Sequence, residues 1–208
     1  MASLLAAGLL AGVAAEKSAA PPAAGTAPAK QAPPIKVPDV IYVPTPQVVV
    51  DKMLEMAEVK SGDVVYDLGC GDGRIVVTAA KKYGVKAKGF DIDPQRVKEA
   101  LENVRAAGVE HLVTIEQADI FTLDLREASV VTLYLLPRLN VQLMPQLAKL
   151  RRGSRIVSHD FDMQGAKPVQ VHQMQLDGSQ SAGDEDGENA SHTIYKWVVP
   201  WAPEPADK

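Results

Sequence analysis

Glycines and aspartates follow an apolar run in "VVYDLGCGDGRI", and their spacing suits the binding of a small ligand. Gly69 and Gly71 come after the run, where missing side chains let the backbone approach a ligand closely. Asp67 ends the run, and Asp72 lies where a following helix would begin. This stretch therefore predicts a ligand-binding loop with carboxylates beside it.

The loop departs from the known phosphate-binding patterns. The dinucleotide fingerprint G-x-G-x-x-G needs a glycine at its sixth position, where this chain has Arg74. Asp72 would repel a phosphate docked at the helix N-terminus and favours a ligand with positive charge. A P-loop is excluded because no G-K-[ST] follows. A reductase that uses a dinucleotide stays open as a minor alternative.

Two later apolar runs also end in carboxylates. In "GFDIDP", Asp91 follows Gly71 at the spacing where a carboxylate accepts hydrogen bonds from ribose hydroxyls. In "EQADI", Asp119 can accept from an adenine amine, while Ile92 and Ile120 can sandwich the ring. Each aspartate could instead be an ordinary helix cap or loop carboxylate. Together they favour a ligand with adenosine, an ammonium, a sulfonium and no phosphate, which is S-adenosylmethionine.

The elements that must position these residues alternate along the chain. Strands are predicted at 64–68, 87–91, 112–118, 130–136 and 155–159, and helices at 47–58, 73–83, 94–107 and 139–150. This alternation predicts right-handed crossovers and a parallel sheet. Two β-rich stretches, 167–178 and 191–200, should pair antiparallel. The expected fold is α/β: a seven-stranded, mostly parallel Rossmann-like sheet with helices on both faces and a C-terminal antiparallel hairpin.

The bulk composition limits the function classes. The 208 residues allow one domain with a sizeable core. A net charge of -4 argues against a nucleic-acid scaffold, which normally needs a basic face. Cys70, the one cysteine, excludes an internal disulfide and a cysteine-built zinc site. We expect it to be a small buried residue of the ligand loop rather than a nucleophile.

The three motifs together resemble those of class I S-adenosylmethionine-dependent methyltransferases. The match runs in order and spacing from about Tyr42 to Pro200. With "YVPTPQVVVDKML" ahead of the loop, the chain is similar to the small protein-lysine methyltransferases of the ATP synthase c subunit and adenine nucleotide translocase, and to their bacterial relatives. In such enzymes the segment matching 43–47 closes over the methionine end of the cofactor, which implies a contact from Thr45.

The resemblance implies direct displacement of a methyl group from S-adenosylmethionine, with a protein lysine amine as the favoured acceptor. A methyltransferase for a small metabolite and a non-catalytic S-adenosylmethionine-binding module remain alternatives. We expect a protein partner as acceptor, no nucleic acid, no transmembrane segment and a monomer. The residues expected to bind the cofactor are Thr45, Asp67, Gly69, Cys70, Gly71, Asp72, Asp91, Ile92, Asp119 and Ile120.

The acceptor side is less defined by its residues. The fourth strand ends "TLYLLP" where enzymes that methylate adenine or cytosine amines carry N-P-P-Y, so that reaction loses support. An amine acceptor must lose a proton before attack, and the weak candidates for a catalytic role are Tyr134, His159 and Asp160. "SHDFD" offers one histidine with two aspartates, which is a weak metal pattern, so no metal is expected. His172 and His192 are expected on the surface of the hairpin.

The start of the chain differs from the rest. Residues 1–15 form either a signal peptide or an apolar tail, because an apolar run ends in a small-x-small pattern but lacks a positive n-region. Residues 16–38 are rich in Ala and Pro and are predicted to be a disordered linker. Residues 39–208 are the expected methyltransferase domain. The signal-like start suggests export and the cofactor supply suggests the cytoplasm, so the compartment stays open.

Overall fold

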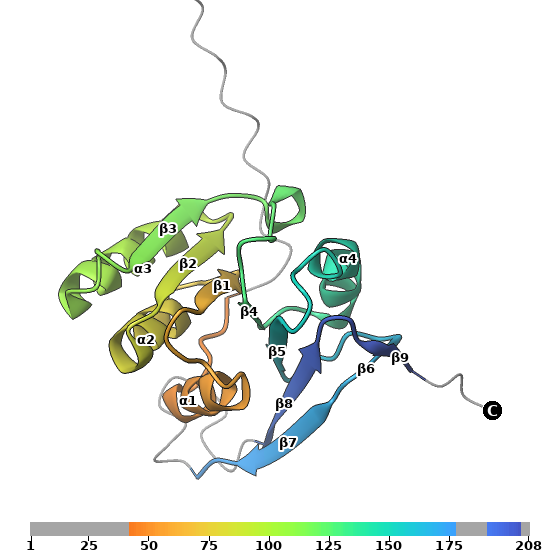
Figure 1. Cartoon of the computed structure of the whole chain (residues 1–208). Helices are drawn as coiled ribbons and strands as arrows, with labels where there is room; N and C mark the ends of the chain where they lie inside the picture. Colours follow the sequence, from red (N-terminus) through yellow and green to blue (C-terminus); the bar gives the residue numbers. More distant parts are fainter. Residues whose placement is uncertain (1–41, 178–190, 205–208) are drawn as a thin grey trace, which may run out of the picture. The chain divides into compact units, whose positions relative to one another are not determined.

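The computed structural model of the protein describes residues 42–177 and 191–204. Within these residues, seven strands form one sheet in the order β3-β2-β1-β4-β5-β8-β7 (Figure 1). Neighbours from β3 to β5 pair parallel, whereas β8 pairs antiparallel with both β5 and β7. The predicted fold class is therefore confirmed. The predictions for residues 1–15 and 16–38 lie outside the described residues.

The helices and strands follow the predicted alternation. The strands are β1 (Val64–Leu68), β2 (Lys86–Asp91), β3 (Val113–Gln117), β4 (Val130–Leu133), β5 (Arg155–His159), β6 (Ala166–Lys167), β7 (Gln170–Gln175), β8 (Ser191–Val198) and β9 (Ala202–Pro203). The helices are α1 (Gln47–Met56), α2 (Arg74–Tyr83), α3 (Pro94–Ala107) and α4 (Pro137–Leu147), with a 3₁₀ turn, η1, at Ile120–Thr122.

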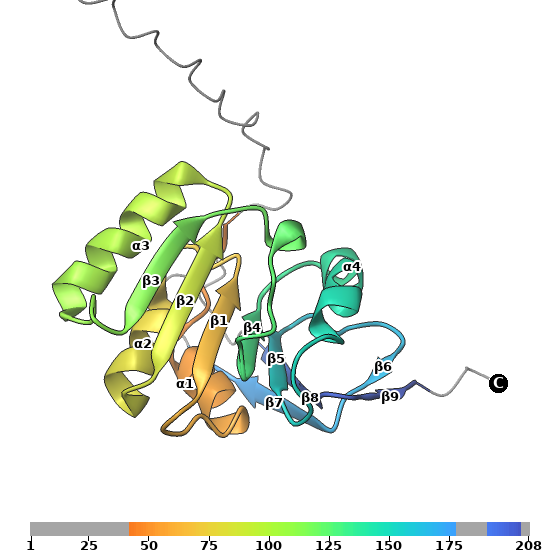
Figure 2. The same cartoon turned by 45° about the horizontal axis from the view of Figure 1, so that its top comes forward.

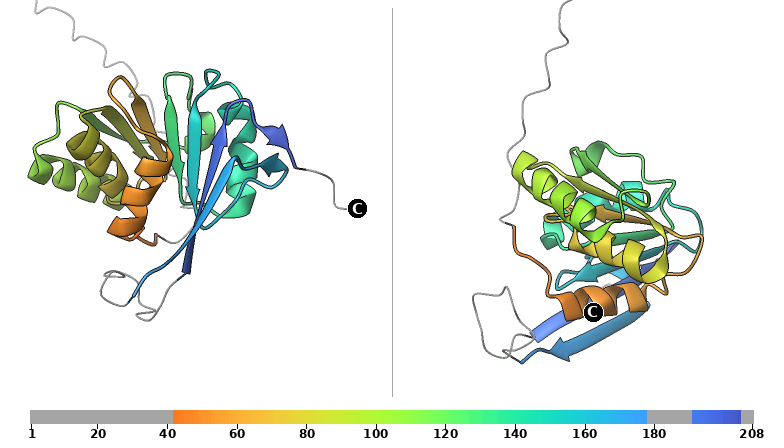
Figure 3. Two further views of the ribbon diagram at one scale, coloured as in Figure 1. Left: turned by 60° about the horizontal axis from the view of Figure 1, so that its bottom comes forward. Right: turned by 90° about the vertical axis from the view of Figure 1, so that its left-hand side faces the viewer.

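Successive strand residues face opposite sides of the sheet, and each side buries its own core. On one side Val65 and Val157 join apolar residues of α1 and α2. On the other side Tyr66 and Ile156 join the apolar residues of α4. Figure 2 shows α3 beside β3 and β2, and Figure 3 shows α1 beside the β7–β8 hairpin. The central strands β1, β4 and β5 are thus covered on both faces, as their continuous apolar runs predict.

The structure departs from the sequence prediction at the end of β4. A strand was expected over 130–136, but β4 ends at Leu133 and α4 already begins at Pro137. Tyr134, Leu135 and Leu136 leave the sheet and line a pocket. Apolar residues at a pocket and apolar residues in a buried strand have the same sequence pattern, which explains the error. The pair β6–β9 and the turn η1 were also not predicted.

The order of the strands places the site. Strand β1 lies between β2 and β4, so the chain moves outward in opposite directions from this point of the sheet. Leu68 at the end of β1 is level with Phe90 of β2 and Leu133 of β4. In open α/β sheets, ligands bind beyond the strand ends at such a reversal. No helix among the described residues is long and apolar enough to cross a membrane.

A polar network lies at the amino ends of the central strands, opposite the ends where the ligand site is expected. The Asp63 carboxylate accepts hydrogen bonds from Ser129 Oγ (2.7 Å) and from the Arg155 guanidinium. The Arg155 Nε donates in turn to the Ala57 carbonyl oxygen at 2.9 Å. The side chains of Asp63 and Arg155 are only 6% and 14% exposed. Removing one partner would leave a charge that is both buried and unpaired.

We therefore predict that Asp63→Ala lowers the free energy of unfolding by about 3 kcal/mol, the scale for breaking a buried ion pair. Asp124→Ala is the matched control, because its ion pair with Arg126 is largely exposed and exposed pairs contribute little to stability. Urea unfolding of both variants measures the difference. Equal effects of the two substitutions would contradict a structural role for the network.

Candidate functional site

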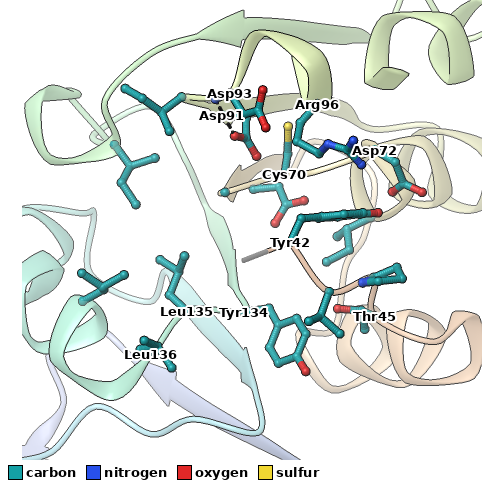
Figure 4. A pocket seen from close by; sticks show the side chains of 18 of the residues that line it. Tyr42, Thr45, Cys70, Asp72, Asp91, Asp93, Arg96, Tyr134, Leu135 and Leu136 are labelled. Atoms are coloured by element: carbon teal, nitrogen blue, oxygen red, sulfur yellow. Dashed lines mark hydrogen bonds between the residues drawn. The ribbon is translucent and has the colours of Figure 1, made fainter. Parts of the chain in front are cut away.

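A pocket of about 670 Å³ lies at the carboxyl ends of the central strands (Figure 4). Its volume is within the range of small-molecule sites. All residues predicted to bind the cofactor line it, except Gly71. The predicted residues that line it are Thr45, Asp67, Gly69, Cys70, Asp72, Asp91, Ile92, Asp119 and Ile120. Residues far apart in the sequence are thus brought to one cavity.

Gly71 is covered by an aromatic ring. Its backbone φ is +52°, and a Cβ atom there would lie 2.1 Å from Cε2 of Tyr42. A side chain at this position is therefore excluded by Tyr42, whereas the sequence suggested close approach of a ligand. The Arg96 guanidinium lies 4.7 Å from the centre of the Tyr42 ring on the pocket wall. Burial, with the nearby Asp72 charge, raises the pKa of Tyr42 to about 12.

The Asp91 carboxylate is held at the end of β2 by two backbone N–H groups. Its Oδ2 accepts from the Gly71 amide and its Oδ1 from the Asp93 amide, both at 2.9 Å. Burial raises the pKa of this carboxyl above its ordinary value. Each carboxylate oxygen can accept more than one hydrogen bond. Asp91 can therefore hold the glycine loop and still accept from the hydroxyls of a bound ribose.

Asp67 is buried at the base of the pocket. Only 3% of the residue is exposed, and its Oδ1 accepts a hydrogen bond from Thr132 Oγ1 at 2.7 Å. Burial raises the pKa of Asp67 to about 7. A cation arriving in the pocket would favour the ionised form of this group.

Asp72 does not act as a lone negative charge, contrary to the sequence interpretation. The Arg74 guanidinium forms an ion pair with it, with Nη2 at 2.7 Å from Oδ2. The other terminal nitrogen of Arg74, Nη1, donates to the Thr45 carbonyl oxygen at 2.8 Å. The pair therefore offsets the charge of Asp72. It also ties the glycine loop to the segment that carries Thr45, a role that the sequence reading missed.

The remaining predicted residues are those expected to contact the adenine, together with Cys70. Asp119 Oδ1 accepts from the Phe121 amide at 3.1 Å and caps η1, so this carboxylate is a cap and a pocket residue at once. Ile92 and Ile120 line the same region. Cys70 is 5% exposed, and burial raises the pKa of its thiol well above the ordinary value. A buried neutral thiol agrees with the expected packing role.

Of the three acceptor-side candidates, only Tyr134 lines the pocket. The ring centre of His159 lies 4.0 Å from that of Tyr134, but His159 is fully buried behind it. Asp160 points to the hairpin, where its Oδ1 accepts from the Thr193 amide at 2.7 Å. His192 was expected on the surface, and this prediction is wrong: it is 6% exposed and contacts His159.

The sequence reading missed several lining residues. Arg96 comes from the first turn of α3, Leu139 from α4, Phe121 from η1 and Phe161 from the loop after β5. Figure 4 shows Arg96 near Asp93, and Tyr134 toward Thr45. Phe121 and Phe161 could have been predicted to line the pocket from their positions, because each closely follows a strand end that carries candidate site residues.

Together, the strand order, the glycine loop and carboxylates at three successive strand ends define a class I S-adenosylmethionine-dependent methyltransferase. The model of the ANTKMT methyltransferase domain matches residues 67–170. A protein-lysine N-methyltransferase of Saccharolobus islandicus (strain REY15A) is 46% identical over 165 residues, which cover 78% of this chain and 96% of that protein. The chain belongs to the ANTKMT methyltransferase family, and S-adenosylmethionine is its cofactor.

Two other relatives differ in what they cover and in what their names say. The adenine nucleotide translocase lysine N-methyltransferase of Mus musculus is 34% identical over 124 residues, 59% of this chain and 53% of that protein. This chain thus matches about half the length of the mouse enzyme. An RNA methyltransferase from Salinibacter ruber, solved with S-adenosyl-L-homocysteine, is 45% identical with a TM-score of 0.67. The match covers 80% of this chain and 100% of that one.

The pKa of Asp67 leads to a prediction about cofactor binding. At pH 7 its carboxyl holds part of a proton in the free protein, and a positively charged cofactor favours the ionised form. We therefore expect cofactor binding to release part of a proton at pH 7, and affinity to rise as the pH increases through 7. Calorimetric titrations in two buffers of different protonation enthalpy measure this release.

Asp67→Asn is the control for the proton release, because an amide of the same size cannot titrate in this range. Its binding heat should be the same in both buffers after correction for other groups. A proton release that is identical in wild type and in Asp67→Asn would contradict the assignment.

Proposed function

We propose that this protein transfers the methyl group of S-adenosylmethionine to the side-chain amine of a protein lysine. The observation that carries the proposal is the 46% identity with an archaeal protein-lysine N-methyltransferase, over nearly the whole of that protein. Residues 39–208 would form the methyltransferase domain. The predicted residues that line the pocket, together with Gly71 beside it, would bind the cofactor as the sequence motifs predict.

The pocket lining near Thr45 suits an acceptor side chain with a long, apolar stem. Tyr134 and Phe161 are stacked there, with ring centres 6.0 Å apart. Val43 and Leu136 are pocket residues that are also 47% and 37% exposed. A lysine can bury its four-carbon stem along such a surface. The aromatic rings can then face the nitrogen, which becomes cationic as it is methylated.

The transfer itself is a direct displacement. The lone pair of the neutral lysine Nζ attacks the methyl carbon, the carbon–sulfur bond breaks, and sulfur keeps the electron pair. The amine must lose a proton to solvent or to a nearby group before attack. Tyr134 would serve as an acceptor contact that aligns the nitrogen with the methyl group, since alignment is the main requirement of this step. His159 packs against the ring of Tyr134, and neither His159 nor Asp160 lines the pocket.

RNA is the second candidate acceptor, because the Salinibacter ruber relative is named an RNA methyltransferase. Two observations on this chain speak against it. The net charge of -4 is unfavourable for binding phosphate. The fourth strand is followed by Tyr134, Leu135 and Leu136 rather than by the Asn-Pro-Pro-Tyr motif of enzymes that methylate base amines.

An extract of the source cell distinguishes the two acceptors. We predict that methyl-labelled S-adenosylmethionine and the purified protein label material that survives nuclease and is lost on protease treatment. Acetylation of lysines in the extract beforehand should remove most of the label, and hydrolysis of labelled protein should yield methyllysine.

Asp91→Asn, with impaired cofactor binding, is the control for labelling by other enzymes in the extract. Label that is lost on nuclease treatment and unaffected by lysine acetylation would contradict the proposal and assign the acceptor to RNA.

A further inference from the structure

Three side chains converge at the junction of β5 and β8, outside the cofactor pocket. His159 ends β5, Asp160 follows it, and His192 is the second residue of β8. The Nε2 of His159 lies 2.9 Å from Nδ1 of His192 and 3.1 Å from Oδ2 of Asp160. The third side of this triangle, from His192 Nδ1 to Asp160 Oδ2, is 3.3 Å. Each of these atoms is a potential metal ligand.

Hydrogen bonds cannot satisfy all three sides of this triangle. A neutral imidazole carries one proton on two nitrogens, and an ionised carboxylate carries none. If His159 Nε2 donates to His192 Nδ1, the lone pair of that Nδ1 faces the lone pairs of Asp160 Oδ2. If His192 Nδ1 donates to Asp160, the lone pair of a His159 Nε2 acceptor faces the carboxylate instead. One repulsive contact remains in each arrangement of neutral histidines, and a cation bound to all three atoms would remove it.

Further contacts orient two of the three side chains. The other ring nitrogen of His159, Nδ1, lies 3.2 Å from Thr45 Oγ1, and metal-binding histidines are usually held by such a partner. The other oxygen of Asp160, Oδ1, accepts from the Thr193 amide at 2.7 Å, which leaves Oδ2 directed at the histidines. Asp160 also has a φ of +58°, in the left-handed region that non-glycine residues rarely adopt. Such a conformation persists where surrounding contacts require it.

We propose that His159, Asp160 and His192 form a binding site for a divalent transition-metal ion of the zinc type. Two imidazoles and a carboxylate suit such ions. With bonds of about 2.0–2.1 Å, tetrahedral ligand atoms lie about 3.4 Å apart, so the three atoms need to move apart by only a few tenths of an ångström. The prediction that no metal is bound considered only His159 and the aspartates that follow it as ligands. The fold adds His192, a second histidine 33 positions later.

The metal would fasten β8 to the end of β5 and hold the Thr45 segment through His159. That segment carries pocket residues 42–45 and is tied on its other side by Arg74. The site is therefore structural and positioning, because none of its three residues lines the cofactor pocket. Metal binding at this site does not depend on the identity of the methyl acceptor.

Metal binding is tested directly on the full chain, prepared without a histidine tag and treated with a chelator. Titration with Zn²⁺ in competition with a chromophoric chelator should give one tightly bound ion per chain. The melting temperature should rise on addition of stoichiometric Zn²⁺. His192→Asn and Asp160→Asn should each weaken Zn²⁺ binding at least about tenfold and abolish the rise in melting temperature.

His172→Asn is the matched control. His172 lies on the neighbouring strand β7, level with Ile194 of β8, and outside the triangle. This variant should bind Zn²⁺ like the wild type. Wild-type protein that takes up no stoichiometric Zn²⁺ would overturn the proposal and make the triangle a proton-sharing cluster. Equal Zn²⁺ affinity of His192→Asn and His172→Asn would overturn it as well, whatever the melting temperatures of the metal-free variants.

Discussion

The hydrogen bond from the Gly71 amide to the Asp91 carboxylate joins the two strand ends on which the pocket depends. Strand β1 delivers the glycine loop, and β2 delivers the aspartate at the same level of the sheet. Parallel pairing brings both to one edge, and the reversal of strand order beside β1 leaves a crevice there. The arrangement of Asp67, Asp119 and the isoleucines follows from this framework, because each is placed by a strand in the same register.

A second set of contacts closes the framework from the side of the chain that precedes α1. Arg74 bonds to Asp72 and to the Thr45 carbonyl, while the ring of Tyr42 covers Gly71. The loop, the preceding segment and the pocket wall are therefore one connected unit. The missing side chain of Gly71 makes room for Tyr42, so that the segment can lie against the loop.

Sequence reasoning predicted most of the sheet because the signals there are local. The bounds of β1, β5 and α3 agree with prediction, since apolar runs and the Pro94 and Gly108 punctuation mark them. The prediction failed where one apolar pattern is compatible with two structures. Residues 134–136 are apolar because they line the pocket, and this pattern also fits a buried strand. The burial of His192 could not be predicted, since it depends on β8 pairing with β5 rather than on anything near it in the sequence.

Methyl transfer by this protein requires that the pocket at Gly71 and Asp91 hold S-adenosylmethionine. Calorimetric titration of the full chain with S-adenosylmethionine, and with NADH as a control, tests this most directly when it is repeated on Asp91→Asn. We expect saturable binding of S-adenosylmethionine and none of NADH. In Asp91→Asn the binding of S-adenosylmethionine should be weaker by about 2 kcal/mol, or roughly thirtyfold, the scale of a hydrogen bond to a charged group. Binding of NADH, or an unchanged affinity for S-adenosylmethionine in Asp91→Asn, would contradict it.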